Sequence, residues 1–341
     1  MSLKVSIIIS NRNDLAMLSV TVRSCIEELK PLGPGSGEIV ICDNSDEEIY
    51  KKLPSVLPIS YIREGLLSVY RQDFPCLFTA RETAISKAEG DYVICLDSHM
   101  IVGHNMILDL VNFMDSKKDD PTLGFAHAPI NWSHQHESNA RHDRDMSESE
   151  LGPWGTAYDY ERTITWKGMP WICRRKWFLN KETGLGGYGA LSEYKLSWGG
   201  GDILIGVKPW LLGFRNWAVP CSPGTHIGPF PNIDSAKKPG MVKVTGNGYR
   251  LWSTSGSGPL LIGYLVSCYV LGGDSMMRRN APIINECFGI DVRQYWLKAR
   301  MYGRNEKAWL DKRKVMTFEQ LLETKPWDSY DRQGNLQSVA V

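Results

Sequence analysis

Ile94-Cys95-Leu96-Asp97-Ser98-His99 is the stretch of sequence that decides the fold. Its apolar residues predict a buried strand, which presents Asp97 and His99, two residues apart, on one side of its carboxyl end. A carboxylate and an imidazole in this arrangement suit one divalent cation, and the mixed oxygen and nitrogen set favours Mn²⁺ or Mg²⁺ over a thiolate-binding metal. The alternative is a solvated turn, because strands often end in polar residues.

The first hundred residues of the chain alternate between strand-like and helix-like segments. Val5–Ser10, Glu38–Cys42, Ile59–Arg63 and Tyr92–Leu96 predict strands. Leu15–Leu29 and Phe78–Ala88 predict helices. Such alternation predicts an α/β fold with a mostly parallel sheet and with ligands at the carboxyl ends of the strands. Polar clusters lie at these ends: Asn11–Asp14, Asp43–Asp46 and Asp97–His99.

Composition and charge limit the classes to which the protein can belong. The chain has 341 residues, 43% hydrophobic and 23% charged, and its 39 basic and 38 acidic residues give a net charge of +1. These values are ordinary for a soluble globular protein of about two domains. They exclude a disordered chain, a globally basic nucleic-acid coat and a polyacidic tail, but they leave room for a local patch of charge.

Neither a leader nor a membrane span is predicted. Val5–Ile9 is too short for the core of a signal peptide, and Pro259–Leu271 is shorter than the roughly 20 residues of a membrane helix. Pro259–Leu271 therefore predicts a buried core helix. The eight cysteines form no Cys-x-x-Cys pair, which favours reduced, buried thiols over disulfides or a zinc site. We expect a cytoplasmic protein.

Two further motifs carry residues suited to chemistry. The first, Leu196-Ser197-Trp198-Gly199-Gly200-Gly201-Asp202, combines glycines, which let a backbone approach a ligand closely, with a tryptophan and an acid. The second, Pro220-Cys221-Ser222-Pro223-Gly224-Thr225-His226, predicts a strand end and a turn that aims an imidazole. Each motif alone is a weak signal, but the ordered set of three is fairly specific.

Together the three motifs resemble those of nucleotide-sugar-dependent glycosyltransferases of the GT-A fold, most closely the polypeptide N-acetylgalactosaminyltransferases. In that family an Asp-x-His motif ends a strand, Trp-Gly-Gly-Glu follows about a hundred residues later, and a second histidine comes after it. Ala80-Arg81-Glu82-Thr83-Ala84 and Gly90 precede Asp97 much as in the family, and the resemblance covers roughly residues 4 to 230. It implies a Rossmann-like GT-A fold, here with an α-rich C-terminal extension.

Carried over residue by residue, the resemblance implies a metal-dependent enzyme that uses a UDP-sugar. Asp97, His99 and His226 would hold the Mn²⁺ or Mg²⁺ on the diphosphate, whose developing negative charge needs a Lewis acid. Asp43 and Asn44 would meet the uracil or the ribose. The donor-binding residues implied besides Asp97 are Asn11, Asp43, Asn44, Arg81, Trp198, Gly199 and Gly200.

The sequence departs from the family at the acidic residue. The family has Glu three residues after Trp, whereas here that place is Gly201 and the acid is Asp202. Several inverting GT-A enzymes, β-1,4-galactosyltransferases among them, carry a general-base Asp at the spacing of Asp202. We therefore favour Asp202 as the base that takes the acceptor's hydroxyl proton in an inverting transfer. Retention stays open, and so does an N-cap role for Asp202 before the apolar run Ile203–Leu212.

The character of the chain changes after about residue 230, so we expect a catalytic domain over residues 1–232 and a helical extension over residues 233–341. Arg293–Lys314 holds eight basic and two acidic residues with aromatic residues interleaved. Cations for phosphates and rings for unstacked bases suit a nucleic-acid acceptor, with Arg300, Arg304 and Lys307 as contacts. An amphipathic helix whose aromatic residues face the core explains the pattern equally well.

Other aromatic and histidine residues are weaker candidates. His134, His136 and His142 suit a second metal site, but a polar loop that is rich in histidine explains them better. Three tryptophans either form a platform for an acceptor sugar or base, or belong to the core: Trp154, Trp166 and Trp171.

The acceptor is predicted as a hydroxyl group on a macromolecule. The leading hypothesis is a flipped-out 5-hydroxymethylpyrimidine in DNA, modified by a virus-encoded enzyme in the host cytoplasm. A protein Ser or Thr hydroxyl is the first alternative, although the mucin-type family works behind a membrane anchor and usually carries a lectin domain, neither of which is recognised here. A catalytically silent nucleotide-sugar-binding module is the second, favoured by Gly201 in place of Glu. No oligomeric state is predicted.

Overall fold

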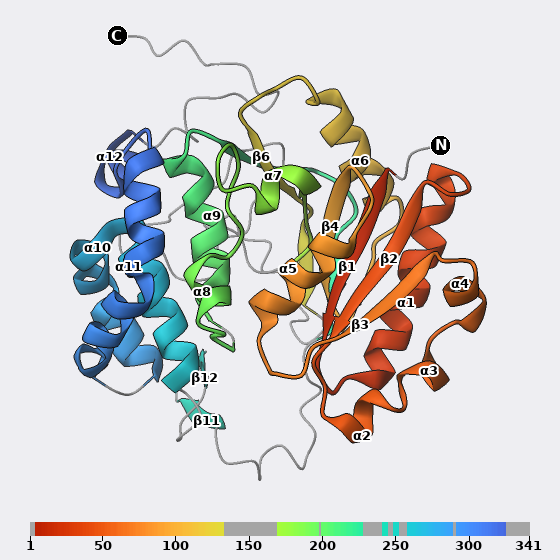
Figure 1. Cartoon of the computed structure of the whole chain (residues 1–341), viewed down its shortest axis with the longest axis horizontal. Helices are drawn as coiled ribbons and strands as arrows, with labels where there is room; N and C mark the ends of the chain where they lie inside the picture. Colours follow the sequence, from red (N-terminus) through yellow and green to blue (C-terminus); the bar gives the residue numbers. More distant parts are fainter. Residues whose placement is uncertain are drawn as a thin grey trace.

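The computed structural model of the chain describes residues 4–132, 169–197, 199–227, 241–244, 248–251, 258–288 and 291–324. Figure 1 shows helices packed around a central sheet, with the C-terminal helices gathered on one side. Six residues considered above lie outside the described residues: His134, His136, His142, Trp154, Trp166 and Trp198.

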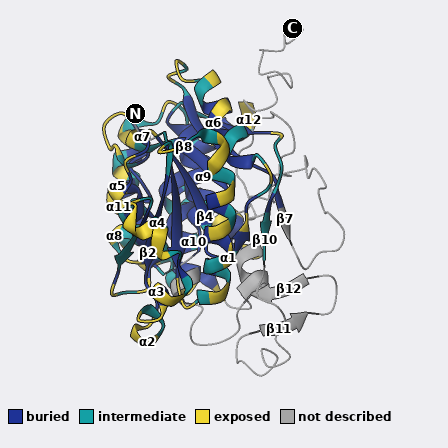
Figure 2. Cartoon of the chain, turned by 90° about the vertical axis from the view of Figure 1, so that its right-hand side faces the viewer, coloured by how far each residue is buried: buried dark blue, intermediate teal, exposed yellow. Residues whose placement is uncertain are grey.

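The central sheet has seven strands in the order β3-β2-β1-β4-β8-β6-β9. Its neighbours β3, β2, β1 and β4 are parallel, and β8 runs antiparallel to both β4 and β6. The strands are β1 (Val5–Asn11), β2 (Gly37–Asp43), β3 (Leu67–Arg71), β4 (Tyr92–Asp97), β6 (Leu123–His127), β8 (Trp171–Arg174) and β9 (Arg215–Ala218). Every residue of β1 is buried, and Figure 2 shows the strands as the buried centre of the molecule. The predicted mostly parallel α/β fold is therefore confirmed.

Helices cover both faces of this sheet in its N-terminal half. Helix α1 begins after Asp14, whose side chain accepts a hydrogen bond from the backbone N–H of Met17 (3.2 Å), and it buries Leu18, Val22 and Cys25. The helices of residues 15–211 are α1 (Leu15–Leu29), the 3₁₀ helix η1 (Lys30–Leu32), α2 (Glu47–Tyr50), α3 (Leu53–Val56), α4 (Ile59–Arg63), α5 (Leu77–Lys87), α6 (Met106–Ser116), α7 (Arg175–Leu179), α8 (Ala190–Glu193) and α9 (Gly201–Leu211).

One predicted strand is wrong. Residues Ile59–Arg63 form the short helix α4 after Pro58, and the third strand of the sheet comes later, at Leu67–Arg71. Ile59 and Ile62 are exposed, whereas Leu67 is buried beside β2. Ile59 and Ile62 therefore lie on the surface, and the apolar residues of this segment do not form a buried strand face.

A second, three-stranded sheet lies at the carboxyl end of β4. Its order is β5-β10-β7, with β5 (Met100–Ile101), β7 (Ile130–Trp132) and β10 (Gly224–His226). This small sheet joins the segment that follows Asp97 to a segment more than a hundred residues later in the chain. A two-stranded sheet consists of β11 (Met241–Val244) and β12 (Gly248–Leu251).

The C-terminal part is helical, as predicted. Its elements are α10 (Gly258–Phe288), the 3₁₀ helix η3 (Val292–Tyr295), α11 (Trp296–Arg313) and α12 (Phe318–Thr324). Helix α10 is interrupted at Gly273, which has a positive φ of 63°, and it packs against α9 and α11. Leu261, Leu265 and Val266 are fully buried, so the predicted core helix over Pro259–Leu271 is confirmed where side chains are described.

The findings on disulfides and on membrane-spanning helices refer to the described residues alone. The seven cysteines whose side chains are described are free thiols, and all except Cys221 are buried. Within the same part of the chain, every helix is too short or too polar to cross a membrane.

Candidate active site

Asp97 is the last residue of β4, His99 lies in the turn between β4 and β5, and helix α1 holds this turn in place. The hydroxyl of Thr21, which is fully buried, donates a hydrogen bond to the carbonyl of Ser98 (2.9 Å) and accepts one from the backbone N–H of Met100 (3.0 Å). Both ends of the turn are thus tied to α1. This tie fixes the backbone from which Asp97 and His99 project.

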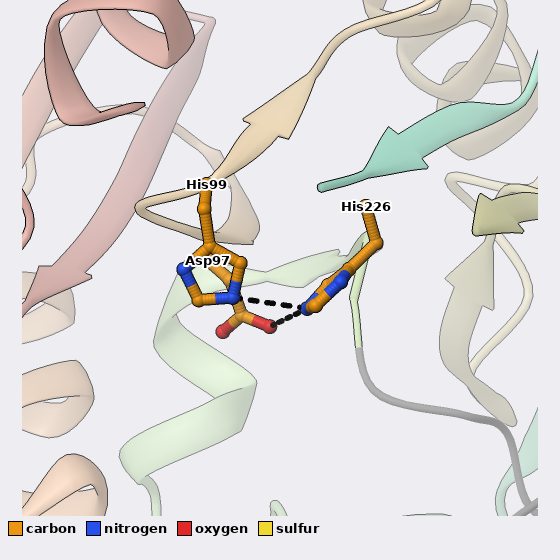
Figure 3. Close-up of side chains that lie close together, drawn as sticks. All are labelled: Asp97, His99 and His226. Carbon is orange, nitrogen blue, oxygen red and sulfur yellow. Dashed lines mark hydrogen bonds and ion pairs between the residues drawn. The ribbon is translucent and has the colours of Figure 1, made fainter. Parts of the chain in front are cut away.

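His226 reaches the same point from strand β10. Because β10 pairs antiparallel with β5, His226 lies opposite Met100, and the N–H of Ile227 donates to the carbonyl of His99 (2.8 Å). The Nε2 atoms of His99 and His226 are 3.0 Å apart, and Nε2 of His226 is 3.6 Å from Oδ2 of Asp97. Figure 3 shows these three side chains pointing toward one another. The fold therefore brings together the three predicted metal ligands.

Asp97 is held as a carboxylate by its neighbours. Burial alone would raise the pKa of Asp97, but the hydrogen bond from His226 and the positive charge of Arg81 hold that pKa well below its usual range. Nη2 of Arg81 lies 2.7 Å from Oδ1 of Asp97, and the Arg81 side chain is buried. Arg81 therefore occupies one carboxylate oxygen and leaves Oδ2 on the side of the histidines.

The three side chains fit a divalent cation. One donor atom from each lies within 4.8 Å of the others. The separation of 3.0 Å between the two Nε2 atoms is the one expected for two ligands at right angles, each about 2.1 Å from one ion. An ionised carboxylate oxygen and two imidazole nitrogens form a mixed set suited to Mn²⁺ or Mg²⁺. No other such group of histidines, cysteines and acids was found among the described residues.

The carboxyl ends of β1 and β2 hold a second polar cluster around Asp43. The fully buried carboxylate of Asp43 accepts hydrogen bonds from Nδ2 of Asn11 (2.6 Å), from the N–H and the hydroxyl of Ser45 (3.0 and 2.9 Å) and from Arg71 (3.2 Å). Asn44 lies beside Asn11, and in its better-satisfied amide orientation it donates to the Asn11 carbonyl. The predicted uridine-binding residues thus share one cluster, to which Ser45 and Arg71 are added. Contact with the nucleotide stays a prediction.

The glycine-rich motif forms the entry to helix α9. Gly199 and Gly200 are buried with positive φ values of 99° and 77°, and Gly200 is the N-cap of α9. Asp202 lies in the first turn of the helix, so its predicted N-cap role is wrong. Burial alone would lower the pKa of Arg81, whereas the carboxylates of Asp97 and, more weakly, Asp202 raise it, so Asp202 lies within electrostatic reach of the Arg81–Asp97 pair. Its role as base stays a prediction.

Tyr188 is a site neighbour that the sequence analysis missed. Its hydroxyl lies 3.3 Å from Nη1 of Arg81, and its backbone N–H donates to Oε1 of Glu82 (2.5 Å). Helix α5 thus carries both Arg81, which contacts Asp97, and Glu82, which holds the backbone of Tyr188 beside Arg81. Glycines flank Tyr188 in the sequence, and this cluster of glycines could have indicated a tightly packed segment.

The predicted acceptor contacts mostly serve the fold. Trp171 is fully buried and stacks on Phe178, with ring centroids 5.5 Å apart, so Trp171 belongs to the core and the platform hypothesis is wrong for it. Arg300 forms two hydrogen bonds with Asp274 (2.8 and 2.7 Å). Lys307 pairs with Asp311 (2.8 Å), and Arg304 is exposed. The amphipathic-helix alternative thus describes α11 better than a free row of cations.

Several known proteins are similar to this chain. Residues 6–169 match the glycosyl transferase family 2 model. This segment of the chain is thus similar to the family 2 glycosyltransferases. A putative polypeptide N-acetylgalactosaminyltransferase 13 of Drosophila melanogaster is 25% identical over 250 residues, which cover 65% of this chain and 41% of that protein. The chain thus spans less than half the length of this relative.

A solved structure shows the same fold. The crystal structure of GalNAc-T7 with UDP, GalNAc and Mn²⁺ matches with a TM-score of 0.63 at 21% identity, over 96% of this chain and 57% of that one. The predicted GT-A fold and the resemblance to the N-acetylgalactosaminyltransferases are confirmed, and these similarities support the predicted glycosyltransferase activity.

Proposed function

We propose that this glycosyltransferase transfers a sugar from a UDP-sugar to a hydroxyl group of an acceptor, with a divalent cation held by Asp97, His99 and His226. The observation that carries the proposal is the convergence of these three side chains at the carboxyl edge of the sheet. The GalNAc-T7 structure, which holds UDP and Mn²⁺, supports the same donor class and a divalent cation here.

The residues of the site have separate roles in the proposed reaction. A bound divalent cation neutralises the negative charge that develops on the departing diphosphate. Asp97, whose pKa is held low by the hydrogen bond from His226 and by Arg81, would supply the negative ligand, and His99 and His226 would each supply a ring nitrogen. Asp202 takes the proton of the acceptor hydroxyl as that oxygen attacks, which gives an inverting transfer.

For the acceptor, we propose a Ser or Thr hydroxyl of a polypeptide. The similarity to a putative polypeptide N-acetylgalactosaminyltransferase supports this choice over DNA. The basis of the DNA hypothesis is weakened because Arg300 and Lys307 pair with acids of the chain's own C-terminal part. A cytoplasmic location stays a prediction.

The first experiment measures release of UDP from a set of UDP-sugars, with Mn²⁺, Mg²⁺ or a chelator, and without acceptor. An active enzyme should hydrolyse its donor slowly, and the chelator should stop this hydrolysis. If no donor is turned over with water or with any acceptor, the protein is a silent nucleotide-sugar-binding module and the proposal is wrong.

The second experiment identifies the acceptor by a mass-shift screen with Ser/Thr peptides, hydroxymethylated DNA and plain DNA. A hexose or N-acetylhexosamine added to a peptide supports the proposed acceptor. Addition to hydroxymethylated DNA alone contradicts it. In that case charge reversal at Arg304 should weaken DNA binding and make its salt dependence shallower.

A further inference from the structure

Asp14 contacts the metal-binding turn and the start of helix α1 with its two carboxylate oxygens. Oδ1 accepts the backbone N–H of Met17 (3.2 Å), which makes Asp14 the N-cap of α1. Oδ2 lies 3.4 Å from Nδ1 of His99. The same carboxylate thus joins the first turn of a helix to the ring nitrogen of His99 that points away from His226.

We infer that Asp14 is a positioning residue for His99: it holds the proton on Nδ1 and so keeps the lone pair of Nε2 directed at the cation. This inference rests on the proposed metal site. A neutral imidazole carries one proton, and the ring nitrogen that donates a hydrogen bond decides which nitrogen is free to bind a metal. Nδ1 faces a carboxylate, which accepts, while Nε2 faces His226 at 3.0 Å.

The surroundings of His99 leave this role to Asp14. The backbone of the turn is already fixed by Thr21, and the His99 carbonyl accepts from Ile227. These contacts hold the main chain but do not select an orientation of the ring. Asp14 acts on the ring itself, and its own rotamer is restrained by the hydrogen bond to Met17.

The test separates the helix cap from the contact with the histidine. In Asp14→Ser the hydroxyl can still cap α1, but it is too short to reach Nδ1 of His99 in the same way. In Asp14→Asn the amide oxygen can still accept from Nδ1, without the negative charge. The matched control is Asp291→Ser, at the N-cap of η3, where Asp291 accepts from Arg293 outside the site.

Two measurements are made on the full chain. Titration calorimetry with Mn²⁺ in the presence of UDP gives the metal affinity, and thermal unfolding gives the stability of each variant. Long-range ¹⁵N–¹H NMR of the metal-free protein, at a pH where the imidazoles are neutral, shows which nitrogen of His99 carries the proton, with His99→Gln assigning the signals.

We expect Asp14→Ser to bind Mn²⁺ about 10- to 100-fold more weakly than the parent protein, with a nearly unchanged melting temperature. The Nδ1-protonated form of His99 should dominate in the parent protein and in Asp14→Asn, and become mixed in Asp14→Ser. Asp291→Ser should change neither readout.

Equal metal affinity and the same His99 tautomer in Asp14→Ser and the parent protein would overturn the inference. Failure of the parent protein to bind Mn²⁺ with UDP would instead count against the proposed function. The NMR measurement then still decides whether Asp14 holds the proton on Nδ1, because it needs no metal.

Discussion

Nζ of Lys208 in helix α9 lies 2.8 Å from Oε1 of Glu306 in helix α11, and both side chains are buried. The same ammonium group donates to the carbonyl of Gly187 (2.6 Å), next to Tyr188. A residue of the C-terminal helices therefore pairs with the helix that begins at the glycine-rich motif. The contact crosses the domain boundary expected at residue 232, so the C-terminal helices support the catalytic part of the fold.

Removing one partner of this pair should destabilise the protein strongly. Glu306→Leu leaves the ammonium group of Lys208 buried without its counter-charge, which costs about 3 to 5 kcal/mol of unfolding free energy. Chemical denaturation measures this loss. The double variant Lys208→Met with Glu306→Leu should recover much of the stability, and Asp274→Ala, which breaks the half-exposed pair with Arg300, is the control with little expected change. A Glu306→Leu variant as stable as the parent would contradict the role of the pair.

His226→Ala should remove most metal-dependent turnover. The variant keeps the nucleotide cluster around Asp43 but loses one of three ligands, so we expect UDP-sugar turnover to fall by about 100-fold or more. Turnover is measured as UDP release over a range of Mn²⁺ concentrations. His104→Ala is the matched control, because His104 is highly exposed and lies outside the site. Unchanged turnover in His226→Ala would remove this residue from the metal site.

Asp202→Asn should stop transfer while nucleotide binding survives. The amide keeps the size of the side chain but cannot accept the hydroxyl proton, so the rate should fall by about 10²- to 10⁴-fold. The affinity for UDP, measured by calorimetry, should stay close to that of the parent protein. Asp119→Asn, on an exposed turn after α6, serves as the control. Full transfer activity in Asp202→Asn would exclude Asp202 as the base.

His127 should make the protein sensitive to mild acid. Burial in β6 lowers the pKa of His127 from 6.5 to about 4. Between these two pH values the unfolded chain therefore binds a proton on this imidazole that the folded chain does not bind. Stability should therefore fall as the pH drops from 6.5 to about 4, by about 1.4 kcal/mol for each pH unit. The melting temperature of His127→Gln should depend less on pH in this window, whereas His104→Gln should follow the parent protein. Parallel curves for all three proteins would contradict the prediction.

Local sequence patterns were sufficient for the elements that place the site. Three local patterns each favour one type of element: the β-branched run of β1, the apolar spacing of α1 and the apolar run before Asp97. The structure has these elements where the sequence predicted them. The segment Ile59–Arg63 was misjudged because a five-residue segment with a few apolar side chains is compatible with both a strand and a short helix.

The parts of the site that the sequence analysis missed are contacts between distant residues. Glu306 and Lys208 are 98 residues apart, and nothing local to either residue indicates a buried pair. Tyr188 reaches Arg81 across 107 residues of sequence. Asp14 was identified only as part of a polar cluster, since its contact with His99 depends on how α1 lies against the turn after β4.

The packing at Gly201 limits how this site could change during evolution. A Cβ atom at this position would overlap the ring of Phe78, which is buried and packs against Tyr188. Glutamate at residue 201, where the related motif has it, therefore requires the Phe78 ring to move or to be replaced. An exchange between the two acid positions is thus coupled to the packing of Phe78 against Tyr188.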